Sequence, residues 1–160
     1  MMRVRLPSWR LTALLAILAM GTFTSVALAL QITGTERGDR IVGTAAADSI
    51  LALGGCDRVT GGGGDDAIVG GAGGDLLKGE LGNDTITGGD GGDSVKGGGG
   101  DDTITGGAGF DHLDGGDGND RITAVDGGLD FVECGAGIDA ASGDAADHVD
   151  DDCEHFLVIP

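Results

Sequence analysis

Aspartate residues recur every nine positions along most of this 160-residue chain. Glycines precede each aspartate, most completely from residue 61 onward, and an aliphatic residue follows it two positions later. Carboxylates held beside glycine-rich turns offer the hard oxygen ligands that Ca²⁺ prefers, of which it takes about six to eight in a flexible geometry. The spacing therefore predicts a row of calcium sites. The aspartates in this register are Asp39, Asp48, Asp57, Asp66, Asp75, Asp84, Asp93, Asp102, Asp111 and Asp120.

Each nine-residue unit predicts one turn and one short strand. Six glycine-rich residues form the turn, because glycine adopts the backbone conformations that tight turns require. Three residues centred on an aliphatic side chain form the strand, and two units close one coil of 18 residues. Stacked coils build two parallel sheets whose Ile, Val and Leu side chains meet inside. Aspartates 18 residues apart then lie about 4.8 Å apart in two columns, where like charges oppose folding unless a cation lies between them. Magnesium, which demands a tighter octahedron, fits such turns less well than calcium.

The composition excludes several classes of protein. The chain holds 35 glycines and only 3% aromatic residues, so it lacks the large side chains that fill the core of an ordinary enzyme domain. It has 27 acidic and 9 basic residues, and its net charge of −18 argues against nucleic acid and anionic membranes as partners. Low-complexity disorder explains the composition but not the strict register. We expect that disorder for the calcium-free chain.

The unit G-G-x-G-x-D-x-(apolar)-x resembles the RTX, or haemolysin-type, calcium-binding repeat. Seven consecutive units from Gly61 to Thr123 match it, and Glu80 is the one departure at their glycine positions. The resemblance implies an all-β fold, a right-handed parallel β-roll (a β-solenoid), with calcium between successive turns and about five well-formed sites. The side-chain ligands that it implies are Asp66, Asp75, Asp84, Asp93, Asp102, Asp111 and Asp120; Asp57, from the unit before, completes the set that we expect to bind calcium.

The two ends of the chain depart from the pattern. The first three units, residues 34–42, 43–51 and 52–60, keep the aspartates and aliphatics but lose glycines. We expect them to extend the solenoid and to bind calcium weakly or not at all, or to cap it. The repeats are thus predicted over residues 30–123 and are best formed over 61–123. After residue 123 the register slips by one position, and residues 124–160 are predicted to cap the open end of the stack.

The three cysteines are Cys56, Cys134 and Cys153. Cys134 and Cys153 both lie in the predicted capping segment, and in an exported chain we expect them to form a disulfide. The alternative is a zinc site that adds His148 and His155, but it lacks the paired C-x₂₋₄-C spacing of structural zinc sites. Cys56 is left as a buried thiol, an intermolecular bridge or the partner of one of the other cysteines.

The first 29 residues differ from all that follow. Arg3, Arg5 and Arg10 form a basic start, an apolar stretch covers residues 11–20, and Ala27 and Ala29 supply a small-x-small cleavage pattern. This layout predicts a secretory signal peptide over residues 1–29, cleaved after Ala29. The mature protein is therefore expected to be secreted, extracellular and free of membrane attachment.

The chain has no H-E-x-x-H or G-x-S-x-G motif, and we expect no enzymatic activity. The predicted function is that of a secreted calcium-binding protein whose folding is coupled to extracellular calcium. The alternative is a calcium-stabilised, adhesin-like module that binds a partner on the flat face of the solenoid. The sequence does not identify that partner.

Overall fold

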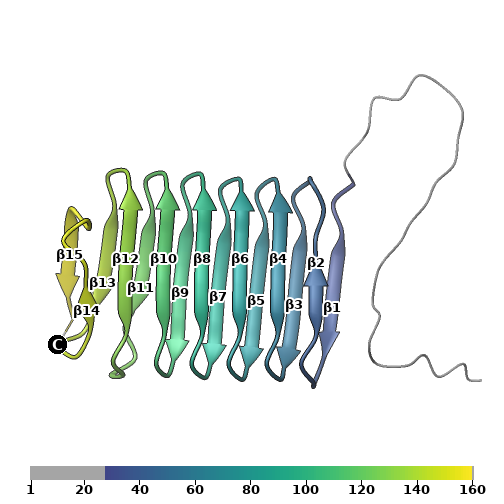
Figure 1. Ribbon diagram of the computed structural model, residues 1–160, viewed down its shortest axis with the longest axis horizontal. Coiled ribbons are helices and arrows are strands. Elements are labelled where there is room, and N and C mark those ends of the chain that lie inside the picture. Colours follow the sequence, from purple (N-terminus) through teal and green to yellow (C-terminus); the bar gives the residue numbers. More distant parts are fainter. Residues whose placement is uncertain (1–27, 160) are drawn as a thin grey trace, which may run out of the picture.

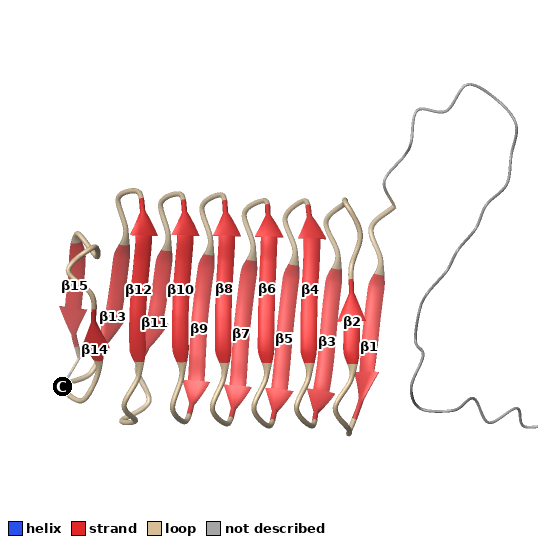
Figure 2. Cartoon of the chain, in the orientation of Figure 1, coloured by secondary structure: helices blue, strands red, loops and turns tan. Residues whose placement is uncertain are grey.

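The computed structural model describes residues 28–159, which form two parallel β-sheets lying face to face (Figure 1). The chain alternates between the sheets, so each pair of consecutive strands makes one coil of a solenoid (Figure 2). Residues 28–159 contain no helix. The predicted fold class, an all-β parallel β-roll of nonapeptide repeats, is confirmed. The predicted signal peptide, residues 1–29, falls almost entirely outside the described residues.

Eight strands form one sheet, here called sheet A, and seven form the other, sheet B. Sheet A contains β1 (Gln31–Thr35), β3 (Ser49–Gly54), β5 (Ala67–Ala72), β7 (Thr85–Asp90), β9 (Thr103–Ala108), β11 (Arg121–Ala124), β13 (Ala140–Gly143) and β15 (His155–Val158). Sheet B contains β2 (Arg40–Val42), β4 (Arg58–Gly63), β6 (Leu76–Leu81), β8 (Ser94–Gly99), β10 (His112–Asp117), β12 (Phe131–Ala136) and β14 (His148–Val149). No helix long and apolar enough to cross a bilayer was found among the described residues.

Neighbouring strands within each sheet are offset by one coil of 18 residues. Thr85 of β7 pairs with Thr103 of β9, for example. The offset grows to 19 residues where Arg121 of β11 pairs with Ala140 of β13, which is the slip expected after residue 123. Because the register stacks equivalent positions, a residue type that recurs every 18 residues becomes a continuous row along the solenoid.

The core is a double row of aliphatic side chains, one from the second residue of most strands. Each is at most 4% exposed. The row from sheet A is Ile50, Ile68, Ile86, Ile104 and Ile122, and the row from sheet B is Ile41, Val59, Leu77, Val95, Leu113 and Val132. Burying one such side chain contributes about 1.5–3 kcal/mol, and each nine-residue unit supplies only one. Interactions in the turns must therefore contribute much of the stability.

The solenoid continues beyond residue 123. The segment 124–160, which the sequence analysis assigned to a cap, adds β12 and β14 to sheet B and β13 and β15 to sheet A. The last strands are short, and all four residues of β15 are exposed. Residues 124–159 are therefore a continuation of the two sheets, and their capping role stays a prediction.

A disulfide joins Cys134 and Cys153, as predicted, with their Cα atoms 5.2 Å apart. Cys134 is a fully buried residue of β12, and Cys153 follows β14 and packs against the end of the core. The bond therefore ties the last coil of sheet B to the coil before it.

Replacing a core isoleucine should test the thin core directly. Ile86→Ala removes a side chain that is 1% exposed, so we expect it to lower the free energy of unfolding by about 2–5 kcal/mol. Thr85→Ala, which alters the exposed neighbour on the same strand, should change it by less than about 0.5 kcal/mol. Denaturant unfolding in calcium, followed by far-UV circular dichroism, measures both. Equal losses for the two variants would contradict this account of the core.

Candidate metal centre

The register places the aspartates of the repeats in two columns, one along each row of turns. The first column, in the turns that lead from sheet B to sheet A, is Asp48, Asp66, Asp84, Asp102, Asp120 and Asp139. The second column, in the opposite turns, is Asp39, Asp57, Asp75, Asp93, Asp111 and Asp130. All of them except Asp39 are at most 4% exposed. The structure therefore buries every aspartate that the sequence predicts to bind calcium and adds Asp130 and Asp139 to the columns.

One oxygen of each buried carboxylate has a protein partner. The backbone N–H of Asp84 donates to Oδ1 of Asp102 at 2.7 Å, and that of Asp93 donates to Oδ1 of Asp111 at 2.9 Å. The same bond links each aspartate to the next one in its column, from Asp39 to Asp130 and from Asp48 to Asp139. These carboxylates thus connect successive coils by hydrogen bonds along both rows of turns.

The other oxygen of these carboxylates is buried without any partner. Ten Oδ2 atoms are in this position: those of Asp57, Asp66, Asp75, Asp84, Asp93, Asp102, Asp111, Asp120, Asp130 and Asp139. A buried ionised oxygen without a hydrogen bond costs several kcal/mol of desolvation. Each of the ten therefore requires a proton or a cation.

The first glycine of the unit keeps open the space in front of seven of these oxygens, those of Asp66, Asp75, Asp84, Asp93, Asp102, Asp111 and Asp120. A Cβ atom on Gly97 would lie within 3.0 Å of both the Oδ2 atom of Asp102 and the carbonyl oxygen of Gly115, one coil later. The same crowding holds at Gly79, with Asp84 and the Gly97 carbonyl. Carboxylate and carbonyl oxygens that converge on a small buried space are the donor set that Ca²⁺ takes. The residues present therefore fit calcium.

The first two units satisfy both carboxylate oxygens without a cation. Oδ2 of Asp39 accepts hydrogen bonds from the backbone N–H of Thr35 at 2.7 Å and from its hydroxyl at 2.8 Å. The backbone N–H of Thr44 donates to Oδ2 of Asp48 at 2.5 Å. These threonines stand where later units have glycine. Asp39 and Asp48 thus have no unpartnered buried oxygen, whereas Asp57, in the third unit, has one.

At the other end, two acidic side chains outside the register close the columns. Asp147 accepts from the backbone N–H of Asp130 at 3.0 Å, and Glu154 accepts from that of Asp139 at 2.8 Å. Sequence reasoning missed both, because they follow their partners by 17 and 15 residues instead of 18. The one-residue slip likewise led the sequence analysis to place Asp130 and Asp139 in the cap.

A second ladder runs along the outside of the turns of the first column. The backbone N–H of Asn83 donates to Asp65, that of Asp101 to Asn83, and that of Asn119 to Asp101, each at 2.8–2.9 Å. Charged and neutral side chains alternate, so exposed carboxylates in this ladder lie two coils apart. Sequence reasoning missed this ladder too, although the alternation of Asp and Asn at 18-residue intervals was its signal.

Burial is the main cause of the raised pKa of eight aspartates in the two columns. It lifts the pKa of Asp66, Asp93 and Asp130 to about 6 and that of Asp102 to about 7. Hydrogen bonds from the backbone lower the pKa, and neighbouring aspartates of the same column raise it further. The pKa values of Asp57, Asp84, Asp111 and Asp120 are raised for the same main reason. Protons and cations therefore compete for the same oxygens near neutral pH.

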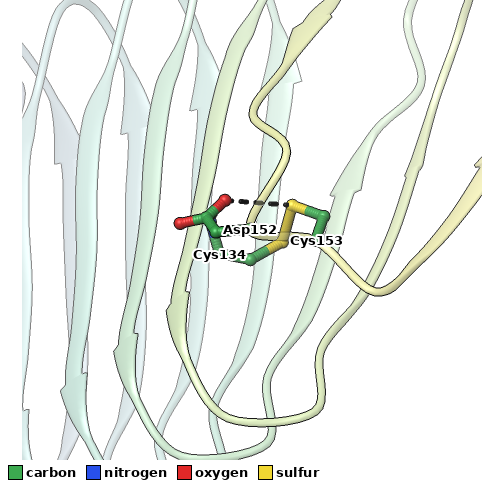
Figure 3. A group of neighbouring side chains, drawn as sticks. All are labelled: Cys134, Asp152 and Cys153. Atoms are coloured by element: carbon green, nitrogen blue, oxygen red, sulfur yellow. Dashed lines mark hydrogen bonds between the residues drawn. A yellow bond between two sulfur atoms is a disulfide. The ribbon is translucent and has the colours of Figure 1, made fainter.

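Cys134, Asp152 and Cys153 form a separate group at the end of sheet B (Figure 3). Asp152 accepts hydrogen bonds from the backbone N–H groups of Cys134 at 3.2 Å and Gly135 at 2.8 Å, and one of its oxygens lies 3.8 Å from the sulfur of Cys153. Both sulfurs belong to the disulfide, so neither is a thiolate that could bind zinc. Cys56 is exposed and unpaired. The buried-thiol alternative is therefore wrong, and so is a disulfide between Cys56 and one of the other two cysteines.

Comparison with known protein families agrees with this geometry. The model of the RTX calcium-binding nonapeptide repeat matches four times, at residues 33–68, 60–95, 69–104 and 96–128. Together these matches cover more than half of the chain, and the protein belongs to this family of calcium-binding repeat proteins. No curated protein sequence matches the chain.

The raised pKa values predict how the calcium-free fold depends on pH. A carboxyl group with a higher pKa in the folded chain holds more protons when folded, so the free energy of unfolding falls as the pH rises between the two pKa values. That interval runs from 3.8 to about 6 for Asp66 and to about 7 for Asp102. In calcium-free buffer we therefore expect more β structure near pH 4.5 than near pH 7.5.

Calcium should reverse this dependence, because it displaces the protons that stabilise the calcium-free fold. Its apparent affinity should rise with pH up to about 7. Far-UV circular dichroism at the two pH values, with and without calcium, measures both trends. A calcium-free chain that loses β structure on acidification would refute the proton competition.

Proposed function

We propose that this RTX-repeat protein is a secreted protein whose folding is coupled to extracellular calcium. The observation that carries the proposal is the set of ten buried carboxylate oxygens without partners, arranged in two columns. Such a chain would be largely unfolded at low calcium and folded into stacked coils at high calcium, so calcium binding would change the conformation of the whole repeat region.

The proposed ligands are the eight aspartates predicted from the sequence, Asp57, Asp66, Asp75, Asp84, Asp93, Asp102, Asp111 and Asp120, together with Asp130 and Asp139. Calcium would lie between successive members of a column, held by their second carboxylate oxygens and by carbonyl oxygens of the glycine turns. About five sites lie between aspartates of the seven matching units from Gly61 to Thr123, in which Glu80 is the one departure from the glycine pattern. The pairs Asp57–Asp75, Asp111–Asp130 and Asp120–Asp139 offer three more at the edges.

Repulsion between carboxylates explains why the folded state would need bound calcium. The columns concentrate carboxylates about 4.8 Å apart in buried turns, and the chain has three times as many acidic as basic residues. Each nine-residue unit buries only one core aliphatic side chain. Its burial offsets only part of this repulsion and of the conformational entropy that a glycine-rich chain loses on folding. Bound calcium removes the repulsion and adds ligand bonds between coils in the same step.

Two features support an extracellular site of action. Residues 1–29 have the charge, apolar run and cleavage pattern of a secretory signal peptide, and the Cys134–Cys153 disulfide is of the kind that persists in oxidising compartments. We assign no catalytic step to the chain, because its clustered carboxylates are accounted for as ladder members.

A calcium-stabilised, partner-binding module is the second candidate, and the outer face of sheet A favours it. The outward-facing first and third residues of β3, β5, β7 and β9 are Ser49, Leu51, Ala67, Val69, Thr85, Thr87, Thr103 and Thr105. None of them is charged, although the chain as a whole is strongly acidic. An uncharged face of this kind could bind an uncharged partner surface, because it repels neither cations nor anions.

A calcium titration of the purified protein, followed by far-UV circular dichroism, tests the proposed function. We expect a cooperative gain of β signal at calcium concentrations up to about a millimolar, with no gain from magnesium at the same concentration. A full β spectrum in chelator at neutral pH would overturn the coupling, because the core and the disulfide would then suffice for folding.

A single substitution separates the role of the buried column from that of acidic charge in general. Asp102→Asn keeps the side-chain volume and the oxygen that accepts from Asp84, but it removes the charge of the unpartnered oxygen. We expect the calcium concentration at half-folding to rise about tenfold, while the calcium-free chain gains β structure.

Asp101→Asn is the matched control for that substitution. Asp101 is the exposed neighbour, and asparagine already occupies the equivalent positions 83 and 119 of the outer ladder. Isothermal titration calorimetry should show fewer ions bound by the Asp102 variant and an unchanged number for the Asp101 variant. Equal effects of the two variants would exclude the buried column as the calcium site.

A further inference from the structure

The outer face of sheet B carries opposite charges at its two ends. The described residues include six lysines and arginines, and four of these, Arg40, Arg58, Lys78 and Lys96, are exposed on β2, β4, β6 and β8. The next two strands present Asp114 and Glu133 at the positions that follow these lysines. The first and third positions of the strands thus change from basic to acidic along the solenoid, although β6 also exposes Glu80.

The strand register orders these charges in a straight row. Lys78 pairs with Lys96, Lys96 with Asp114, and Asp114 with Glu133. One coil, about 4.8 Å, separates each member from the next. A second row beside it runs through Leu76, Ser94, His112 and Phe131. Lys96 forms an ion pair with Asp114, whereas Lys78 has no ion-pair partner among residues 28–159.

We propose that this face binds a second copy of the chain in an antiparallel, two-fold arrangement. A two-fold axis along the strands reverses the order of the coils in the second copy. Lys78 then faces Glu133 of the second copy, and Lys96 faces Asp114. In the neighbouring row, Leu76 faces the exposed ring of Phe131. Because the interface is isologous, every one of these contacts occurs twice.

The alternative two-fold packing of this face lacks such complementarity. With the axis along the solenoid, each coil would face the equivalent coil of the second copy, so the basic half would meet the basic half. Like charges opposite one another are destabilising. The order of charges therefore selects the antiparallel arrangement.

The size of the face is adequate for a stable dimer. In this arrangement the six strands from β4 to β14 overlap; five of them are six residues long and β14 has two residues. At about 4.8 Å between strands and about 3.3 Å per residue, they cover roughly 500 Å² on each copy. The pair would bury about 1,000 Å², which reaches the approximately 1,000 Å² expected of a specific interface. The net charge of the chain opposes association, so calcium bound in the turns, by neutralising carboxylates, strengthens the dimer.

Charge reversal gives a sharp test, because the two partners of the central contact lie on the same chain. Lys78→Glu and Glu133→Lys each place like charges opposite one another twice, so each variant alone should dimerise at least about tenfold more weakly than the wild type. In an equimolar mixture, Glu at position 78 meets Lys at position 133 in one contact, and the native pair forms the other. The mixture should therefore recover a heterodimer, and so should the double variant with itself.

Sedimentation equilibrium in saturating calcium measures these affinities, with Cys56→Ser in every protein to exclude an intermolecular disulfide. Arg121→Glu reverses a basic residue on the outer face of sheet A and should leave dimerisation unchanged. Far-UV circular dichroism in calcium reports that each variant is folded. A monomeric wild type, single variants that dimerise like the wild type, or a mixture that fails to recover the dimer would each overturn the proposal.

Discussion

The stacking of buried carboxylates one coil apart is the interaction on which the rest of this structure depends. One oxygen of each carboxylate binds the backbone of the preceding coil, as Asp102 binds Asp84, and the other faces a small space lined by oxygen atoms. The core, by contrast, is only one aliphatic side chain thick in each sheet. Much of the stability of such a protein therefore comes from interactions in its turns, whereas the turns and loops of an ordinary globular domain are its most mobile segments.

Glycine is as necessary to this arrangement as aspartate. Gly97 has no Cβ atom in the space where the Asp102 carboxylate and the Gly115 carbonyl converge. Gly98, the next residue, has a φ angle of +125°, which side chains disfavour. The solenoid tolerates exceptions singly: Glu80 and Leu53 adopt φ angles of 84° in place of glycine. The glycine content of the chain thus follows from the positive φ angles and from the close approach of successive coils, where a Cβ atom would meet a carboxylate or a backbone carbonyl oxygen.

The period of nine residues is enough to predict the two sheets, the core row and the columns from Asp57 to Asp120, because each depends only on position within the repeat. What could not be predicted depends on departures from the period. The slip after residue 123 was predicted, but not that Asp130 and Asp139 join the columns after it, or that Asp147 and Glu154 reach the columns from irregular spacings. The loss of glycine at Thr35 and Thr44 was visible in the sequence. That their N–H groups satisfy the aspartate oxygens follows only from the turn geometry.

The hydrogen bonds of the columns all point the same way along the chain. The amide of each aspartate donates to the carboxylate of the coil after it, so every coil is completed by residues that come later in the sequence. In the first two units, Thr35 and Thr44 satisfy the carboxylates of Asp39 and Asp48, so this end of the columns needs no cation. The columns are therefore polar: along each one, the amide of an aspartate always meets the carboxylate of the next coil, so the two ends of the solenoid differ chemically.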